Sequence, residues 1–569
     1  MACGPQGGTI RALPAYVDGV PYNPRTVTGR PPVVVDYESF QEPPAALFRD
    51  YLRGEPRVRP FYDGAEWDLP ALLRSADRCL TVPRPRRAVA EALAAQQQGR
   101  GAAMAAQRAA QLGDEETVAV VTGQQPVLFG GPLFVLYKAA AALKLAALLE
   151  SRRGRPVVPV FWSASEDHDF AEVRSVPVLD EPGHIRTLRY EPAREPVGQP
   201  ASRIVLDETI AGLVAEAERS LPAGIHRDQA IELLSRCYRP GSTLAEAFAR
   251  LVSSLFPGLV VLDPSDVALK AHVAPVLARE VREASPTSRL AAKAGEGLLA
   301  AGYHQQVPIR PGFLNLFVMM EGARRPLGTT NGLVEVRGLG RKIPVAEAAR
   351  MLESDPGPWS PGVLLRPLAQ DQLLPTAAYI GGPAEIAYHA QIGPSYAHFG
   401  IPRPALVPRP SLTLVEPAQA RALEAEGLEL WDLQADPEVV ALRWAREAHP
   451  RVEAAFARTR EALEREMAEV EEALASLDPT LRAAAESARG RALHQIESLH
   501  EKSVRALKKK DQSRADRLRR TRDALLPGGS FQERGLGLVS LLARYGTAVV
   551  GEIGERMDLW AKGHQVVSL

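Results

Sequence analysis

The clearest pattern in the chain is an apolar run that leads into a glycine-rich loop and then into a long segment rich in alanine and leucine. Residues 118–121 (Val-Ala-Val-Val) are mostly β-branched, which predicts a strand buried on both faces. The loop at 122–131 holds three glycines, and Pro132 suits the first position of a helix. A strand, a glycine-rich loop and a helix N-terminus can together bind an anion, usually a phosphate. Because neither standard nucleotide-binding fingerprint occurs here, an ordinary tight turn is an equal alternative for the loop taken alone.

A second buried strand is predicted at residues 157–162, and it runs into a cluster of acidic residues and a histidine. The cluster consists of Glu166, Asp167, His168 and Asp169. The order strand, helix, strand predicts a right-handed βαβ unit of a parallel sheet. Ligands of such sheets bind beyond the carboxyl ends of the strands. We therefore expect the glycine-rich loop and the acidic cluster to lie at the same edge of the sheet.

The same pattern continues later in the chain. Further buried strands are predicted at residues 259–262, 363–365, 377–380 and 405–407. Behind one of them, Gly382 is placed as a helix N-cap, Pro383 as the first helical residue and Glu385 as the third, where a carboxylate favours the helix dipole. Residues 176–203 predict a β-rich excursion, and residues 306–343 predict a meander inserted into the parallel pattern.

From about residue 437 the chain changes character. Apolar residues that step by four and three, the spacing of a coiled-coil seam, are Leu463, Met467, Val470, Leu474 and Leu477. Asp478 and Pro479 interrupt the seam, and the same steps resume as far as Leu499. Two long helices that fold back as an antiparallel arm fit this pattern, and a single kinked helix is the alternative. The many lysines and arginines of the second helix fit a solvated face.

These patterns divide the chain into four parts. Residues 1–43 are rich in Pro, Gly and Arg, and we expect a disordered extension with one short strand at 33–35. The other parts are an α/β core at 44–435 with inserts at about 176–255 and 300–345, the arm at 436–526, and C-terminal helices at 527–569 that pack back on the core.

Composition narrows the class of protein. A chain of 569 residues is too long for one hydrophobic core, and its formal net charge of zero argues against broad binding of nucleic acid. Its three cysteines include no C-x-x-C pair, so neither a disulfide framework nor a thiolate zinc site is indicated. This suits a reducing cytosol. With no signal-peptide pattern and no apolar run long enough for a membrane, we expect a cytoplasmic protein.

The acidic cluster is the strongest candidate for catalysis. Its carboxylates could hold Mg²⁺ or supply a general base, while a capped turn is the alternative for any single one of them. Zinc is disfavoured, because no second histidine occurs at helical spacing. Arg366, next to Pro367, suits a carboxylate or phosphate contact, although an ion pair with Asp371 explains it equally well.

Several motifs, in this order along the chain, resemble one known family. They are TGQQP at 122–126, LFGGPL at 128–133, PVFW at 159–162, SEDHDF at 165–170, LDPSD at 262–266, RPL at 366–368, GP at 382–383, EIAY at 385–388, QIE at 495–497 and QER at 532–534. The family is the bacillithiol biosynthesis cysteine-adding enzyme, BshC. The resemblance runs from about residue 44 to the C-terminus. Val127 stands where the family has Gly, and His389 stands where an aromatic residue is common.

The resemblance implies a Rossmann-like core, akin to class I nucleotidyltransferases, with connecting inserts and a coiled-coil arm that mediates homodimerisation. It also implies a ligase that joins cysteine to the amino group of glucosaminyl malate, the last step of bacillithiol synthesis. ATP is the expected energy source, through an acyl phosphate or an acyl adenylate. The alternatives are a nucleotidylyltransferase acting on a phosphorylated or sugar substrate, and a dimeric scaffold that docks partners on its arm.

On this resemblance, we place the nucleotide or substrate phosphates over the glycine-rich loop and the helix that follows it. The residues expected to contact the nucleotide are Gln124, Gln125, Gly130, Gly131, Lys138, Gly382, Pro383, Glu385, Lys502 and Arg505. Glu166, Asp167 and Asp169 are expected to hold Mg²⁺ or to deprotonate the attacking amine, with His168 as general base or charge donor. Arg366 is expected to orient a carboxylate of malate or cysteine.

Overall fold

The computed structural model describes residues 16–17, 20–21, 32–510 and 512–569. Most of the extension expected at residues 1–43 therefore lies outside the described residues. The chain divides into two compact units. The first comprises Met1–Glu181, Ile185–Val415 and Ser530–Leu569, and the second comprises Pro182–His184 and Glu416–Gly529.

A five-stranded parallel sheet forms the centre of the first unit, as the apolar runs predict. Its order is β15 (Ala405–Pro408), β14 (Thr376–Gly381), β4 (Val118–Gln124), β5 (Val157–Ser163) and β8 (Val260–Leu262). Nearly every residue of these strands is buried, since helices pack against them. These helices include α2 (Leu69–Cys79), α3 (Arg86–Gly99), α4 (Ala103–Gln111) and α5 (Leu133–Arg153).

The order of the strands fixes where a ligand would bind. From β4 the chain steps to β5 and then β8 on one side, and it later returns to β14 and β15 on the other side. The strand order thus reverses between β4 and β14. A crevice opens at such a switch point, beyond the carboxyl ends of the strands, and it is the usual binding site of an open parallel sheet.

One predicted strand is wrong. Residues 363–365 form no strand; they lead into α13 (Arg366–Leu373), a helix that begins at the residue expected to follow the strand. Leu364, Leu365 and Leu368 are all buried at the spacing of one helical face. A run of three apolar residues is too short for its period to show, and Pro367 is well tolerated in the first turn of a helix.

Two inserts interrupt the parallel sheet, as predicted. The first contains the antiparallel hairpin β6 (Ser175–Leu179) and β7 (Ile185–Arg189), followed by α7 (Thr209–Ser220), α8 (Ile225–Cys237) and α9 (Leu244–Leu255). The second is an antiparallel sheet of β12 (Arg341–Pro344), β11 (Leu333–Val336), β10 (Ala323–Thr330), β9 (Phe313–Met320) and β13 (Trp359–Pro361). Helices α10 (Val267–Arg282), α11 (Pro286–Ala300) and α12 (Val345–Ser354) accompany it.

A small sheet of three strands joins β3 (Val33–Val35) to two strands from the later part of the chain, in the order β16 (Ser411–Val415), β17 (His564–Ser568) and β3. The short strand expected at 33–35 is therefore present, and it belongs to the first unit rather than to an unstructured extension. The C-terminal helices are α20 (Gln532–Gly535), α21 (Leu538–Tyr545) and α22 (Val549–Arg556). They pack against α5, α8 and β16.

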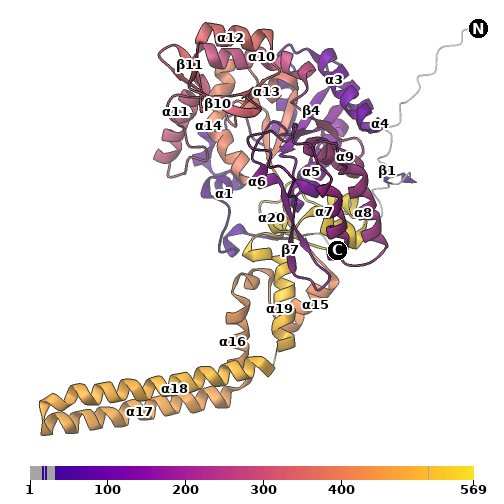
Figure 1. The fold of residues 1–569 in the computed structure, drawn as a ribbon. Helices are drawn as coiled ribbons and strands as arrows, with labels where there is room; N and C mark the ends of the chain where they lie inside the picture. Colours follow the sequence, from indigo (N-terminus) through magenta and orange to yellow (C-terminus); the bar gives the residue numbers. More distant parts are fainter. Residues whose placement is uncertain (1–15, 18–19, 22–31, 511) are drawn as a thin grey trace, which may run out of the picture. The chain divides into compact units, whose positions relative to one another are not determined.

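The second unit is helical. It contains α15 (Pro417–Glu426), α16 (Pro437–Ala448), α17 (Pro450–Leu477), α18 (Arg482–Lys510) and α19 (Gln512–Leu525). Figure 1 shows α17 and α18 side by side, and ion pairs from Arg460 to Glu497 and from Glu453 to His500 fix them as antiparallel. The predicted antiparallel arm is confirmed, and the single kinked helix is wrong. The unit begins at Glu416, earlier than the expected residue 436.

Candidate active site

Two groups of polar side chains lie at the carboxyl edge of the parallel sheet. The crevice cluster, at the switch point between β4 and β14, contains Gln124, Lys138, Arg366, Tyr379, Glu385 and Tyr388. The histidine cluster, behind β5, contains Glu166, Asp167, His168, Lys270 and Arg324. Gln125 joins the two, because it follows Gln124 and its Nε2 donates to Asp167 Oδ2 at 2.6 Å. The loop after β4 and the loop after β5 thus converge, as predicted.

Lys138 lies at the centre of the crevice cluster. Its side chain is only 2% exposed, and Nζ contacts Glu385 Oε2 at 2.5 Å, Gly123 O at 2.6 Å and Gln124 Oε1 at 3.1 Å. Burial lowers the pKa of Lys138, and Glu385 opposes this effect. Three partners use the three protons of an ammonium group. Lys138 therefore ties β4 to the start of α14 (Pro383–Phe399) and does not project toward a ligand.

The helix start after β14 has the predicted form. Helix α14 (Pro383–Phe399) has Gly382 as its N-cap, and Glu385 Oε2 accepts a hydrogen bond from the N–H of Gly382 at 2.8 Å. The other carboxylate oxygen of Glu385 accepts from the Tyr379 hydroxyl at 2.5 Å. Burial would raise the pKa of Glu385, but Lys138 and these hydrogen bonds outweigh it and lower the pKa. Glu385 is thus an anion that organises the crevice.

Arg366 is a partly buried cation whose Nη1 donates to Gln370 Oε1 at 3.2 Å. Its Nη2 donates to Tyr388 Oη at 2.8 Å and lies 3.5 Å from Tyr379 Oη. Burial would lower the pKa of Arg366, but the two tyrosines and Glu385 outweigh it and raise the pKa. Among the residues that the structure describes, no acidic oxygen lies within 4.0 Å of this guanidinium. The alternative ion pair with Asp371 is therefore wrong.

Asp371 has other partners. Its carboxylate accepts from Tyr396 Oη at 2.6 Å and from Gln370 Nε2 at 2.9 Å. Asp371 is 1% exposed, and the two bonds join side chains of α13 and α14. Asp371 thus belongs to the packing of these helices and does not neutralise the charge of Arg366.

The glycines of the first loop serve packing rather than a ligand. Gly130 and Gly131 are buried and have φ of +84° and +72°. A Cβ on Gly130 would lie 2.9 Å from Leu538, and the N–H of Leu133, in the first turn of α5, donates to Leu536 O at 2.9 Å. The C-terminal segment thus covers the helix start that was expected to bind phosphate. Only Gln124 and Gln125 of this loop remain partly exposed among the predicted contacts.

Asp167 and His168 are the partly exposed members of the histidine cluster, with side chains 40% and 35% exposed. Asp167 Oδ1 accepts from the backbone N–H of His168 at 2.7 Å. Burial would raise the pKa of Asp167, but hydrogen bonds from His168 and Gln125 and the charge of Arg324 lower it. Arg324 Nη1 lies 3.3 Å from His168 Nδ1. Asp167 and His168 are suited to proton transfer or to stabilising charge at a bound substrate.

The predicted magnesium ligands do not converge. Glu166 Oε1 pairs with Lys270 Nζ at 2.6 Å, and burial raises the pKa of Glu166 despite this lysine. Asp169 turns away as the N-cap of α6 (Phe170–Val173), accepting from the N–H of Glu172 at 3.2 Å. In the described ranges, no group of three His, Cys, Asp or Glu side chains is arranged to hold a metal ion. The capped-turn alternative therefore holds for Asp169.

Four members of the two clusters were not predicted from the sequence: Tyr379 and Tyr388 in the crevice cluster, and Lys270 and Arg324 in the histidine cluster. Lys270 lies on α10, where Nζ also donates to the carbonyls of Gly357 and Trp359 at 2.8 and 2.6 Å. Arg324 lies on β10 of the second insert, 156 residues after His168. No local signal marks either one, because each is recruited through tertiary folding. Lys502 and Arg505 lie on α18 of the second unit, so their predicted contact with the nucleotide stays a prediction.

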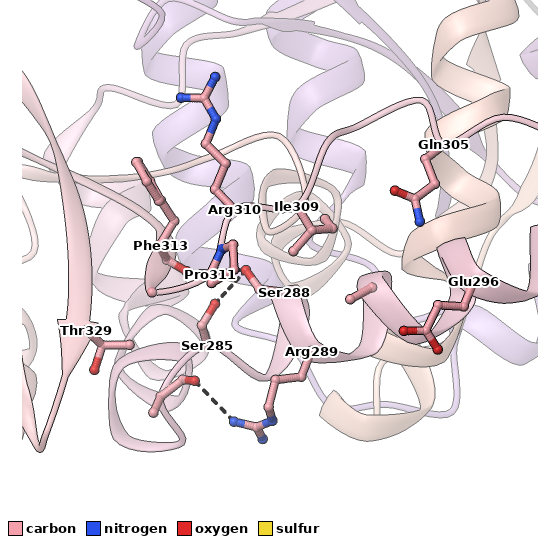
Figure 2. Close-up of a pocket in the computed structure, with 13 residues that line it drawn as sticks. Ser285, Ser288, Arg289, Glu296, Gln305, Ile309, Arg310, Pro311, Phe313 and Thr329 are labelled. Atoms are coloured by element: carbon pink, nitrogen blue, oxygen red, sulfur yellow. Dashed lines mark hydrogen bonds between the residues drawn. The ribbon is translucent and has the colours of Figure 1, made fainter. Parts of the chain in front are cut away.

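A surface pocket of about 380 Å³ lies elsewhere in the first unit, between the start of α11 and the loop before β9. It shares no residue with either cluster. Figure 2 shows Ser285 bonded to Ser288 and the side chains of Arg289 and Arg310 pointing in different directions. Because the hydroxyls of Ser285 and Ser288 are already paired and the arginines do not converge, this pocket offers no site comparable to the crevice.

Comparison with known proteins decides the family. The N-terminal Rossmann-like domain of bacillithiol biosynthesis BshC matches residues 34–410, and the C-terminal coiled-coil domain of BshC matches residues 412–569. The chain belongs to the BshC family. Its α/β core with a coiled-coil arm is the architecture that the resemblance implied, and the prediction of an enzyme of this family is confirmed.

Several named members of the BshC family match this chain over most of their own length. A protein of Salinibacter ruber is 32% identical over 95% of this chain and 100% of its own. A protein of Koribacter versatilis is 34% identical over 89% of this chain and 94% of its own. A protein of Chlorobaculum tepidum is 34% identical over 79% and 83%, respectively. All three carry the name "Putative cysteine ligase BshC". No described helix of this BshC chain has the length and apolar character needed to cross a membrane.

Proposed function

We propose that this chain joins cysteine to the amino group of glucosaminyl malate, the last step of bacillithiol synthesis, and that ATP activates the carboxylate of cysteine. Membership of the BshC family and the names of its relatives support the reaction class. The observation that carries the proposal is Arg366. It is a partly buried guanidinium at the switch point, held by Tyr379, Tyr388 and Gln370 and lacking a carboxylate partner among the described side chains.

The crevice cluster suits two anionic groups. A carboxylate of cysteine or malate would pair with Arg366, since a guanidinium binds a carboxylate with two parallel hydrogen bonds. The second anionic group would bind at the first turn of α14. The N-terminus of this helix carries a partial positive charge, and Ala384 there is exposed. We therefore assign the nucleotide phosphates to the segment from Gly382 to Glu385 and not to Gly130 and Gly131.

Forming the amide requires an activated acyl group. A carboxylate oxygen of cysteine would attack a phosphorus of ATP, giving an acyl phosphate with release of ADP, or an acyl adenylate with release of pyrophosphate. The amine of glucosaminyl malate would then attack the acyl carbon, form the amide and expel phosphate or AMP. The amine loses a proton in this step, and Asp167 and His168 are the partly exposed groups placed to accept it or to stabilise the developing charge.

Magnesium enters this proposal only as part of the nucleotide substrate. Glu166 pairs with Lys270 and Asp169 caps α6, which leaves Asp167 alone, so the three carboxylates do not fit a resident ion. No step is assigned to a protein-bound metal.

A second copy of this chain is the partner that we propose for the arm. Within the second unit, Leu477 and Leu499 are 78% and 60% exposed although both occupy seam positions. Apolar side chains exposed on a coiled coil are typical of an interface with another helix. Light scattering after size-exclusion chromatography would give twice the mass of 61.6 kDa for a dimer. Leu477→Glu together with Leu499→Glu should then give the monomer, and a monomeric wild type would refute the proposal.

The test of the reaction uses purified full-length protein with cysteine, glucosaminyl malate, ATP and Mg²⁺, and detects bacillithiol by mass spectrometry. Product formed together with ADP or AMP supports the proposal and identifies the class of intermediate. Release of pyrophosphate without cysteine would instead favour the nucleotidylyltransferase alternative. Failure to form product while ATP still raises the melting temperature would exclude these substrates and keep the nucleotide site.

A further inference from the structure

We infer that Arg324, from the second insert, is a positioning residue that fixes the ring of His168 in one tautomer: Nδ1 accepts a hydrogen bond and Nε2 carries the proton. His168 then acts as a hydrogen-bond donor rather than as a general base. The use of this donor in amide formation rests on the proposed function, whereas the tautomer itself does not.

Arg324 is rigidly held. Its residue is 8% exposed; Nε donates to Ser360 Oγ at 2.9 Å, and Nη2 donates to Pro361 O at 3.0 Å. The guanidinium also lies over the ring of Phe317, with Cζ 3.7 Å from the ring centroid. These contacts occupy one edge and one face of the group. Nη1 is directed at the histidine cluster, where it lies 3.3 Å from His168 Nδ1 and 3.8 Å from Asp167 Oδ1.

The chemistry of the two groups decides the tautomer. A guanidinium can only donate hydrogen bonds, so the Nδ1 atom 3.3 Å from Nη1 must offer its lone pair. The competing arrangement would place a proton on Nδ1, donated to Asp167 Oδ1 at 3.5 Å. That oxygen is farther away and already accepts from the backbone N–H of His168 at 2.7 Å. The Nε2–H tautomer is therefore favoured, and its proton is available to an oxygen of the substrate.

The first insert sets the position of Arg324 through its backbone. The N–H of Arg324 donates to Gly198 O at 2.8 Å. Gly198 has a φ of +69°, and a Cβ there would lie 2.8 Å from Ala323 Cβ. The segment that holds Gly198 is also anchored to the histidine cluster, because the N–H of Ala201 donates to Asp167 O at 2.9 Å. Both inserts thus meet beside the histidine cluster, and Gly198 packs directly against β10 there.

The direct test is nitrogen NMR of full-length protein labelled with ¹⁵N in its histidine rings, without substrate. The chain has 11 histidines, and the signals of His168 are those lost in His168→Gln. We expect an unprotonated Nδ1 and a protonated Nε2 in the wild type. In Arg324→Met we expect the proton to move to Nδ1, wholly or in part. A protonated Nδ1 in the wild type, or an unchanged spectrum in Arg324→Met, would overturn the inference.

Arg325→Met is the matched control, because the next residue of a strand points to the opposite face. It should leave the His168 signals unchanged.

A second pair of variants leaves Arg324 in place and changes its support instead. Gly198→Ala should change the His168 signals, whereas Gly322→Ala should not: Gly322 has a similar φ of +75° but no atom within 4 Å of its added Cβ. If both or neither of these alanine variants change the signals, the role of Gly198 is refuted.

Activity gives an independent readout once product formation has been established. Loss of a placed proton donor lowers the rate of the chemical step by about 10²–10⁴-fold. Arg324→Met should therefore reduce kcat by about 10²-fold with KM nearly unchanged, and Arg324→Lys should recover part of the loss. An equal rise in KM would show that Arg324 binds substrate instead. Absence of product in the wild type would refute the proposed reaction and leave the NMR result standing.

Discussion

Replacing Lys138 with methionine should destabilise the parallel core, and not merely remove a nucleotide contact. Methionine has nearly the length of lysine, so the change removes the charge while leaving little empty space. Glu385 would lose the ammonium 2.5 Å from its Oε2, and the carbonyl of Gly123 would lose a donor at 2.6 Å. The remaining carboxylate would then lie in a site where its main charge partner is missing.

The magnitude follows from the burial of the pair. Removing one partner of a buried ion pair costs about 3–5 kcal/mol. The Glu385 side chain is 21% exposed, so water offsets part of the cost and the lower end, about 3 kcal/mol, applies. Removing both charges together should cost less, because no unpaired ion remains. Lys138→Met combined with Glu385→Gln should therefore be more stable than Lys138→Met alone, by about 1–2 kcal/mol.

The loss of stability can be measured locally by hydrogen exchange at increasing urea, read by mass spectrometry on peptides from β4 and β14. This measurement does not assume that both units unfold together. The reasoning would be refuted if Lys138→Met exchanged like the wild type but lost affinity for ATP. That outcome would restore Lys138 as a nucleotide contact, as the family resemblance implied.

Three further predictions concern the site and its support. His168→Ala should abolish product formation without changing the urea dependence of exchange, and near-normal turnover would contradict its role. Arg366→Lys should raise the KM of one carboxylate substrate about 10-fold, the equivalent of 1.4 kcal/mol for a lost bidentate contact, and unchanged KM values for both substrates would contradict the assignment. Burial would raise the pKa of Glu533, but its pairing with Arg409 at 2.5 Å outweighs this and lowers the pKa. Since the unfolded pKa is about 4.3, the stability that Glu533 contributes is present above that pH and is lost as the pH falls toward the folded value. The difference in unfolding free energy between wild type and Glu533→Gln should therefore shrink below about pH 4.3, and an equal difference at high and low pH would contradict it.

The parts of the fold that the sequence predicts are those determined locally. Strands β4 and β5 are buried on both faces, so their apolar runs are unbroken and easily recognised. The start of α14 is equally local, because Gly382, Pro383 and Glu385 each occupy a position set by helix capping. The antiparallel arm follows from its seam and from the turn at Asp478.

The predictions from sequence are wrong or incomplete where residues far apart in the chain determine the structure. Gly130 and Gly131 have the composition of a phosphate loop, but they are required because Leu538, more than 400 residues later, packs against the first of them. The role of Arg324 depends on contacts with His168 across 156 residues. Three apolar residues before Arg366 could not distinguish a strand from a helix, and burial against neighbouring helices decided for α13.

The measurement that tests the central claim most directly follows oxygen atoms during the reaction. Cysteine labelled with ¹⁸O in its carboxylate is incubated with the protein, glucosaminyl malate, ATP and Mg²⁺, and every product is weighed by mass spectrometry. If ATP activates this carboxylate, one labelled oxygen appears in phosphate for an acyl phosphate, or in AMP for an acyl adenylate. Bacillithiol formed without transfer of label to either product would contradict activation of the cysteine carboxylate by ATP.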